Sequence, residues 1–246
     1  MHRFFANKDQ LMENEILITG KDVKHIKDVL RLNPKDKIEV AIEGYIYICE
    51  IISLKKDKIL TGIIEKYKGS NESPIHIVLY QGLAKGNKMD TIIQKCTEIG
   101  VKDFYPVALK RSVVKVNDIK REQNKVERWN TIAEEAAKQS KRDILPKVNK
   151  ILSFPEMIEV LKGEKNIVVP YEEEKNNFIK GNLKLDGNKI HLIIGPEGGF
   201  EAEEIEALKA IGANIVTLGP RILRTETAGA VAATILLYEF GDLGVI

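Results

Sequence analysis

The residues best suited to chemistry lie in two loops in the last third of the chain, residues 195–200 and 218–228. Each loop contains glycine and proline and stands between an apolar strand pattern and a helix pattern. Glycine lets a backbone approach a ligand closely, and proline fixes the turn. Loops that follow successive parallel strands meet at the carboxyl edge of their sheet. The sequence therefore predicts one pocket, a candidate active site, built by these two loops.

The first loop, Gly195-Pro196-Glu197-Gly198-Gly199-Phe200, has the composition of a phosphate-binding turn, in which N–H groups and a helix dipole hold an anion. Its charges argue against that ligand. Glu197 lies inside the loop, and Glu201, Glu203 and Glu204 occupy the first turn of the next predicted helix. These carboxylates use the positive end of the dipole and repel polyphosphate. Neither common nucleotide-binding glycine motif occurs here, so a neutral or cationic ligand is favoured.

The second loop offers apolar walls and the start of a helix. Gly219-Pro220 predicts a turn, after which Ile222 and Leu223 could sandwich a flat ring. Thr225 is the predicted N-cap of the last helix. Residues 227–237 are small or apolar on nearly every side, which predicts that this helix is buried.

Two arginines, Arg221 and Arg224, flank the start of that helix and require acidic or anionic partners. The sequence leaves two alternatives open. One is an ion pair with Glu197 or Glu226, and the other is a contact to a substrate.

Hydrophobic periodicity divides the chain into two parts. The first 70 residues are mostly β-patterned, with one helix at residues 22–31, and predict a compact barrel. The polar, turn-rich run 68–74 marks a domain boundary. Strand patterns then alternate with helix patterns, which predicts an α/β fold with a parallel sheet. We therefore expect domains at residues 1–70 and 74–246.

Composition narrows the class of protein. The 246 residues are 43% hydrophobic and 30% charged, as in soluble globular proteins, with no apolar run of membrane-span or signal-peptide length. Cys49 and Cys96 have no metal-ligand spacing around them and are predicted to be small core residues. We expect a cytoplasmic protein with no membrane partner and no metal.

Charge is unevenly distributed along the chain. Residues 71–150 contain 16 Lys and Arg against 10 Asp and Glu, whereas residues 151–246 contain 9 against 15. A basic middle segment, with a basic loop predicted at Lys110–Lys115, suits an anionic partner such as RNA. A solvated lysine-rich surface is the alternative.

The two loops, 195–200 and Leu218–Ala228, resemble the signature of the RsmE family, SPOUT-class methyltransferases of bacterial small-subunit ribosomal RNA. The resemblance covers the whole chain. The other residues that carry it are His2-Arg3-Phe4-Phe5, His25, Val29-Leu30-Arg31-Leu32, Gln81–Gly86, Met89-Asp90, Gln94–Val101, Arg128-Trp129 and Glu135–Arg142.

The resemblance implies an N-terminal PUA-like RNA-binding β-barrel and a SPOUT α/β domain with a C-terminal trefoil knot. It implies a homodimer that binds S-adenosylmethionine in the knot loops. The implied partner is 16S rRNA or the small ribosomal subunit. The implied reaction is methylation at N3 of a uridine, conventionally uridine 1498, near the decoding site.

The resemblance and the residue chemistry together give three sets of candidates. The expected cofactor-binding residues are Gly195, Pro196, Glu197, Gly198, Leu218, Gly219, Ile222, Leu223, Arg224 and Thr227, with Pro170-Tyr171 a further border. The expected RNA-binding residues are Arg3, Arg31, Lys85, Lys88, Arg111 and Lys138. The expected catalytic residues are Arg142, Arg224 and Glu197.

The role of each catalytic candidate stays open. Uridine N3 is a weakly acidic imide that must lose its proton, so the site needs positioning plus a base or a stabilising cation. Arg142 or Arg224 could stabilise charge on the flanking carbonyl oxygens. Glu197 could accept the proton or orient an arginine.

Two other functions fit the same residues. One is an RNA-binding module that has lost activity, against which the two intact loops argue. The other is a SPOUT methyltransferase that acts on another RNA, such as tRNA or large-subunit RNA.

Overall fold

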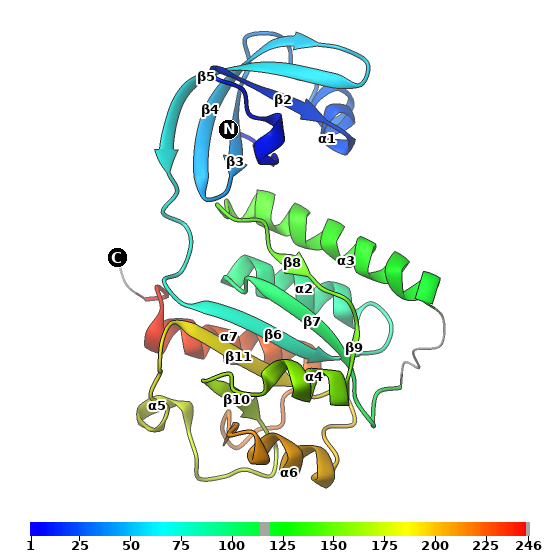
Figure 1. The fold of residues 1–246 in the computed structure, drawn as a ribbon, viewed down its shortest axis with the longest axis vertical. Helices are drawn as coiled ribbons and strands as arrows, with labels where there is room; N and C mark the ends of the chain where they lie inside the picture. Colours follow the sequence, from blue (N-terminus) through cyan, green and yellow to red (C-terminus); the bar gives the residue numbers. More distant parts are fainter. Residues whose placement is uncertain (114–118, 245–246) are drawn as a thin grey trace. The chain divides into compact units, whose positions relative to one another are not determined.

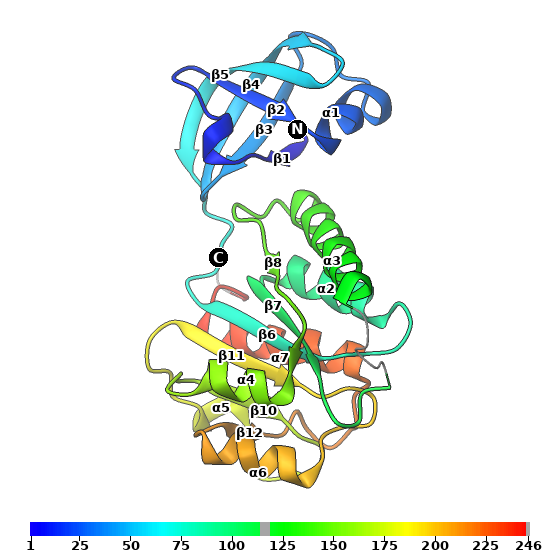
Figure 2. The same cartoon turned by 45° about the vertical axis from the view of Figure 1, so that its right-hand side comes forward.

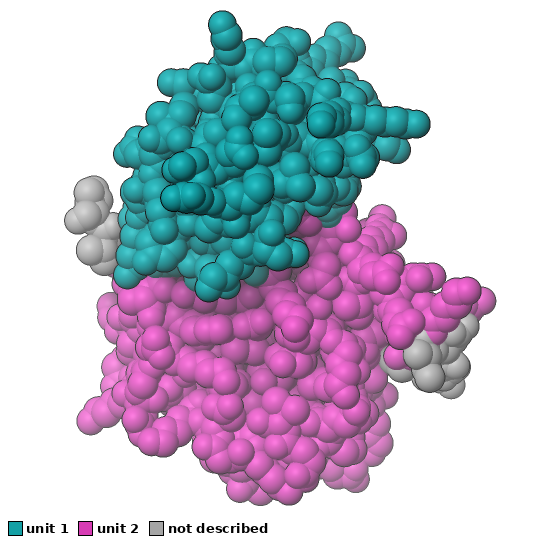
Figure 3. Space-filling view, turned by 45° about the horizontal axis from the view of Figure 1, so that its top comes forward, with its two compact units in different colours: residues 1–72, 137–145 teal, residues 73–136, 146–246 magenta. Residues whose placement is uncertain are grey.

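The computed structural model describes residues 1–113 and 119–244. They form two compact units, shown in separate colours in Figure 3. Unit 1 comprises residues 1–72 and 137–145, and unit 2 comprises residues 73–136 and 146–246. Residues 137–145, which the sequence pattern placed in the second domain, thus cluster with the first. Lys115 of the predicted basic loop lies outside the described residues.

Unit 1 is a strongly curled five-stranded sheet with strand order β1-β3-β4-β5-β2 (Figure 2). Its core consists of every second residue along the strands, such as Ile38 and Val40, whose side chains face inward as the period-two pattern predicts. Strands β1 and β2 are the two ends of the strand order, so the predicted barrel is an open half-barrel. The elements are β1 (Arg3–Phe5), η1 (Lys8–Gln10), β2 (Glu15–Thr19), α1 (Lys21–Lys24), the π-helical η2 (His25–Val29), β3 (Lys37–Ile42), β4 (Tyr45–Leu54) and β5 (Lys58–Lys68).

Unit 2 is a parallel sheet with the order β12-β10-β11-β6-β7-β8, and β9 also pairs with β7. This confirms the predicted α/β class. Its strands are β6 (His76–Gly82), β7 (Asp103–Ala108), β8 (Lys147–Val148), β9 (Leu152–Ser153), β10 (Ile167–Pro170), β11 (Lys189–Ile194) and β12 (Asn214–Val216). Its helices are α2 (Lys88–Ile99), α3 (Ile119–Gln139), whose last residues count with unit 1, α4 (Phe154–Leu161), α5 (Ile179–Asn182), α6 (Ala202–Ala210) and α7 (Thr225–Phe240).

Helices cover both faces of this sheet (Figure 1). On β6, Ile77 and Leu79 face a core shared with α2, α3, α5 and α7, whereas Val78 and Tyr80 face a second core with α4 and α6. A strand that is buried on both faces reads as a continuous apolar run, which is the pattern at β6 and β11. Cys96 lies in the first core and Cys49 in the core of unit 1, as predicted, and Trp129 also lies in the first core.

The carboxyl end of the chain crosses an earlier loop. After β12, at the edge of the sheet, Thr217 donates its N–H to the carbonyl of Asn177 at 2.8 Å. The chain then returns to the middle of the sheet, where α7 contacts β6 and β11 as well as α5. This is the path expected of the predicted trefoil knot. Within residues 1–113 and 119–244, no helix combines the length and apolar character needed to cross a membrane.

Candidate active site

A cavity of about 720 Å³ opens at the carboxyl edge of the unit 2 sheet. Its walls are three loops that follow neighbouring strands: residues 170–178 after β10, residues 194–200 after β11 and residues 217–225 after β12. Ala228 of α7 and Lys88 of α2 complete the lining. The predicted two-loop pocket is therefore confirmed, and the loop after β10 is a third wall.

Close packing fixes the backbone of the 195–200 loop. A Cβ atom on Gly82, at the end of β6, would lie 2.6 Å from the nitrogen of Pro196, so only glycine fits there. Gly199 has φ +71°, and a Cβ on it would lie 2.5 Å from Oε1 of Glu172. The glycines of this loop thus let it pack against two other segments.

Thr225 joins the two signature loops. It is the first residue of α7, and Arg224 is the N-cap, so the predicted capping role of Thr225 is wrong. Its hydroxyl instead donates to the carbonyl of Gly195 at 2.7 Å and accepts from Nε2 of Gln81 at 2.9 Å. These bonds satisfy polar groups at a buried position, and a buried group without a partner costs more than one such bond contributes.

Glu197 forms the polar end of the cavity together with Lys88. Its carboxylate accepts from the Lys85 N–H at 3.0 Å and pairs with Nζ of Lys88 at 3.0 Å. Burial pushes the pKa of Glu197 upward, but the hydrogen bond from Lys85 and the Lys88 ammonium outweigh it and lower the pKa. The same contact raises the pKa of Lys88. Both groups therefore stay charged at neutral pH, and Glu197 is a weak proton acceptor.

Arg221 and Arg224 line the cavity with exposed side chains and form no ion pair with a described residue. The carboxylates considered as their partners are engaged elsewhere, because Lys88 lies 3.0 Å from Glu197 and 3.5 Å from Glu226. The intramolecular alternative is thus not formed. The two guanidinium groups remain available to an anionic ligand at the mouth of the cavity.

Carboxylates and their protein partners surround the N-terminus of α6. Glu204 accepts from the backbone N–H of Lys110 at 3.0 Å and of Glu201 at 2.9 Å. Arg111 pairs with Glu201 at 3.0 Å. A phosphate group has no place at this helix start, as the acidic first turn predicts.

Most predicted cofactor residues line the cavity: Gly195, Pro196, Glu197, Leu218, Gly219, Ile222, Leu223 and Arg224. Gly198 and Thr227 do not line it. Ile222 is 86% exposed, an unusual state for an isoleucine, and it stands at an apolar wall that also includes Phe178 and Phe200. Phe200 ends the first signature loop but was not among the expected cofactor residues, and Phe178 lies outside both loops, although Pro170 and Tyr171 beside that wall were expected to border the site.

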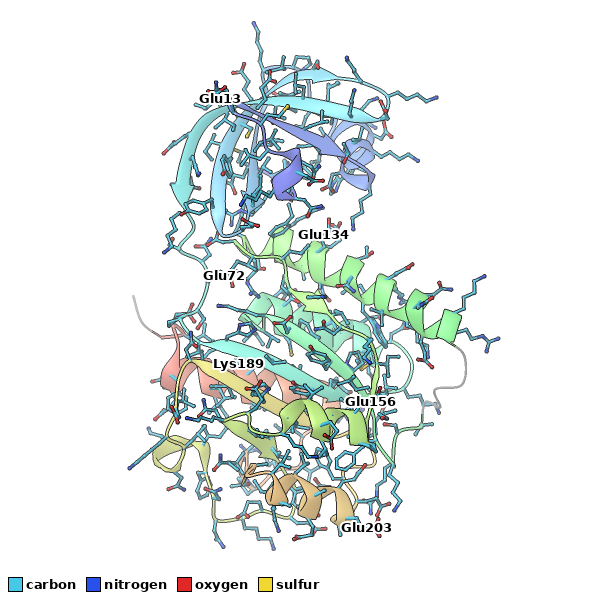
Figure 4. All side chains as sticks on the ribbon, viewed as in Figure 1. Glu13, Glu72, Glu134, Glu156, Lys189 and Glu203 are labelled. Carbon is cyan, nitrogen blue, oxygen red and sulfur yellow. The ribbon has the colours of Figure 1, made fainter. Side chains whose placement is uncertain are left out.

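Three predicted RNA or catalytic residues are buried within unit 1. Arg3 pairs with Asp143 at 2.7 Å and Lys138 pairs with Asp22 at 2.6 Å, so neither charge is available to an RNA phosphate. Arg142 binds both carboxylate oxygens of Glu72, the residue labelled after β5 in Figure 4. A buried cation is stable only with such partners, which assigns these residues to the structure of unit 1.

The remaining RNA candidates lie at the surface. Arg31 and Lys85 are exposed, Lys88 is half-buried beside Glu197, and Arg111 is bound to the loop that contains Gly198. Arg31 and Lys85 are thus the freest of the predicted cations.

The chain matches two family models. Residues 71–237 match the RNA methyltransferase domain, and residues 18–64 match the RNA methyltransferase PUA domain. These spans agree with the parallel sheet of unit 2 and the curled sheet of unit 1.

Relatives match nearly the whole chain. The ribosomal RNA small subunit methyltransferase E of Bacillus subtilis is 38% identical over 97% of both chains. The protein of the same name from Aquifex aeolicus is 33% identical, over 96% of this chain and 99% of the relative. A crystal structure of the Neisseria gonorrhoeae protein of that name, bound to S-adenosyl methionine, superposes with TM-score 0.89 at 29% identity and 99% coverage of both chains. The chain therefore belongs to the ribosomal RNA small subunit methyltransferase E family.

Proposed function

We propose that this protein transfers a methyl group from S-adenosylmethionine to N3 of a uridine in 16S rRNA, at the position conventionally numbered 1498. The cavity at the carboxyl edge of the unit 2 sheet carries the proposal, because it unites the two signature loops and opens to solvent. The names of the relatives support small-subunit rRNA as the substrate. With ribosomal RNA as the substrate, we expect the protein to act in the cytoplasm.

The cavity residues fit S-adenosylmethionine. Its volume of about 720 Å³ lies within the range of small-molecule sites, about 300–1,000 Å³. Apolar Leu218, Ile222 and Leu223 would hold the adenine ring, and the main-chain groups of Gly195 and Gly219 would bind the base and ribose. Three carboxylates on two of the loops suit the cationic groups of the cofactor, namely Glu172, Glu174 and Glu197. When bound, the cofactor supplies an electrophilic methyl group.

The charges of the site favour a stabilising cation over a carboxylate base. The lowered pKa of Glu197 makes it a weak base, and its pairing with Lys88 fixes its orientation. Arg224 is held at the start of α7 because its carbonyl accepts from the N–H groups of Thr227 and Ala228, both at 2.8 Å. We assign to Arg224 the stabilisation of negative charge on the uracil oxygens, since a preorganised cation lowers the barrier most where charge develops.

The homodimer is part of the same proposal. Helix α7 is apolar on nearly every side, yet Tyr238, one residue beyond the segment expected to be buried, is 64% exposed. An exposed aromatic residue on an apolar helix suits an interface with a second copy of the chain. Replacing Tyr238 with glutamate is expected to produce monomers, as measured by sedimentation. A variant that still dimerises would remove α7 from the interface.

Calorimetric titration of the purified protein with S-adenosylmethionine tests the cofactor assignment, and we expect saturable binding at one site per chain. Binding that is absent from the folded protein would instead support an RNA-binding module without activity. Recovery of the methyl label in tRNA or 23S rRNA, with none in 16S rRNA, would instead support a methyltransferase that acts on another RNA.

A further inference from the structure

Arg111 lies behind the cofactor loop rather than in the cavity. Its Nη1 donates to the carbonyl of Gly198 at 3.0 Å, and its Nε and Nη2 donate to the two carboxylate oxygens of Glu201 at 3.0 and 3.2 Å. One planar guanidinium thus holds both a backbone carbonyl of the 195–200 loop and the residue that precedes α6. The fork geometry of arginine suits this double contact.

The packing around Gly198 shows how closely the two segments approach. A Cβ atom on Gly198 would lie 2.9 Å from the Cβ of Arg111 and 3.2 Å from its backbone oxygen. Gly198 itself does not line the cavity, but its neighbours Glu197 and Gly199 do. Arg111 therefore contacts the residue, Gly198, that lies between two residues of the cavity wall.

The next residue of the same loop, Gly199, packs against a second segment. The Cβ that Gly199 lacks would contact Glu172, which lies on the loop after β10 and lines the cavity. The 195–200 loop thus contacts both Arg111 and the 170–178 loop. Removing the arginine contact leaves the loop with one of these two supports.

We propose that Arg111 is a positioning residue that fixes the 195–200 loop for S-adenosylmethionine, rather than a residue that binds RNA phosphate. This rests on the proposed function, because it requires the cofactor to bind in the cavity. The expectation that Arg111 is an RNA contact is accordingly replaced.

The neighbouring residue provides a matched control. Lys110 carries the same charge one position earlier and pairs with Glu203 at 2.8 Å, a carboxylate that is 84% exposed on α6 (Figure 4). Lys110→Gln removes one positive charge and one surface ion pair but leaves the contact to Gly198 intact. Arg111→Gln removes the same charge together with that contact.

Calorimetry with S-adenosylmethionine separates the two variants. We expect Arg111→Gln to raise the Kd about tenfold, which corresponds to ~1.4 kcal/mol, and Lys110→Gln to change it less than about twofold, as for exposed pairs. In methyl transfer to small subunits, Arg111→Gln should raise KM for the cofactor with little change in kcat. Arg111→Lys, which retains the charge but not the fork, should give an intermediate Kd.

RNA affinity gives the opposite comparison. With a 16S rRNA fragment as probe, both glutamine variants should lose affinity equally, since each loses one cation. A second pair, Glu201→Gln and Glu203→Gln, tests the contact from the other side. Glu201→Gln should weaken cofactor binding, because Arg111 loses its carboxylate partner. Its RNA affinity should equal that of Glu203→Gln, although Arg111 is then released from Glu201.

Three results would overturn the assignment. Equal cofactor affinity of Arg111→Gln and Lys110→Gln would show that the contact to Gly198 has no effect on the cavity. A larger loss of RNA affinity in Arg111→Gln than in Lys110→Gln would make Arg111 an RNA contact. Failure of the unsubstituted protein to bind the cofactor would refute the proposed function itself, and the positioning role with it.

Discussion

The hydroxyl of Thr225 is the most informative single group to remove, because it joins the two signature loops. Thr225→Val keeps the shape of the side chain and deletes both of its hydrogen bonds, to Gly195 and Gln81. Nε2 of Gln81 keeps a second acceptor, the carbonyl of Gly82 at 3.1 Å, whereas the carbonyl of Gly195 loses its bond to the hydroxyl. The Gly195 carbonyl is only part-buried, so each of the two lost bonds is counted as an ordinary one, about 0.5–1.5 kcal/mol.

The free energy of unfolding of Thr225→Val is therefore expected to fall by about 1–3 kcal/mol, measured by urea denaturation. Cofactor affinity should fall as well, because the carbonyl of Gly195 is no longer anchored to α7. Thr227→Val is the control, since Thr227 is exposed in the same helical turn and should cost less than about 0.5 kcal/mol. Thr225→Ser should retain cofactor affinity. Equal stability of the Thr225→Val and Thr227→Val proteins would refute the account of how the loops are joined.

Three further predictions follow from the same structure. Gly82→Ala places a Cβ 2.6 Å from the nitrogen of Pro196, so the free energy of unfolding should fall by about 1–3 kcal/mol. Cofactor binding measured by calorimetry should weaken as well. Unchanged stability and cofactor affinity would show that the loop has room to move. Arg224→Gln should lower kcat about 100-fold, the typical effect of removing one charge-stabilising donor, with cofactor Kd nearly unchanged; a similar kcat loss in Arg221→Gln would remove the distinction between the arginines. Burial lowers the pKa of His191 below its usual 6.5, so this residue contributes stability above pH 6.5 that is lost as pH falls through the folded-state pKa. The difference in unfolding free energy between pH 7.5 and pH 5.5, measured with urea, should therefore be smaller in His191→Phe than in the unsubstituted protein. An equal difference would assign the pH dependence to other groups.

The cavity could be predicted from sequence because its signals are local. Glycine and proline between a strand pattern and a helix pattern locate a loop, and parallel order brings loops to one edge. The acidic start of α6 similarly excluded phosphate from the ligands before any geometry was known. These inferences needed no contacts between distant residues.

The partners of the charged side chains could not be predicted in this way. Arg3 and Asp143 are 140 residues apart in the sequence, yet they form a buried pair at 2.7 Å. Lys138 follows the exposed pattern of a long helix but pairs with Asp22 in unit 1. Helical periodicity shows which face of a helix is polar, but it does not show which polar residues will pack against another segment of the chain. The grouping of residues 137–145 with unit 1 was therefore not predicted.

Thr225 shows the same limit within the active site. A threonine before an apolar helix is a common N-cap, and local pattern favoured that role. Tertiary structure placed Gly195 and Gln81 within reach of the hydroxyl, which bonds to both of them. The loop after β10 was underestimated for a related reason, because its phenylalanine at position 178 reads as an isolated surface residue.

Mass spectrometry of rRNA after methyl transfer tests the proposed reaction itself. Small subunits from a strain that lacks the modification would be incubated with the protein and S-adenosylmethionine with a labelled methyl group. We expect a single labelled nucleoside, N3-methyluridine, in 16S rRNA near the decoding site. Label on another atom or another RNA, or no label although the protein binds the cofactor, would contradict it.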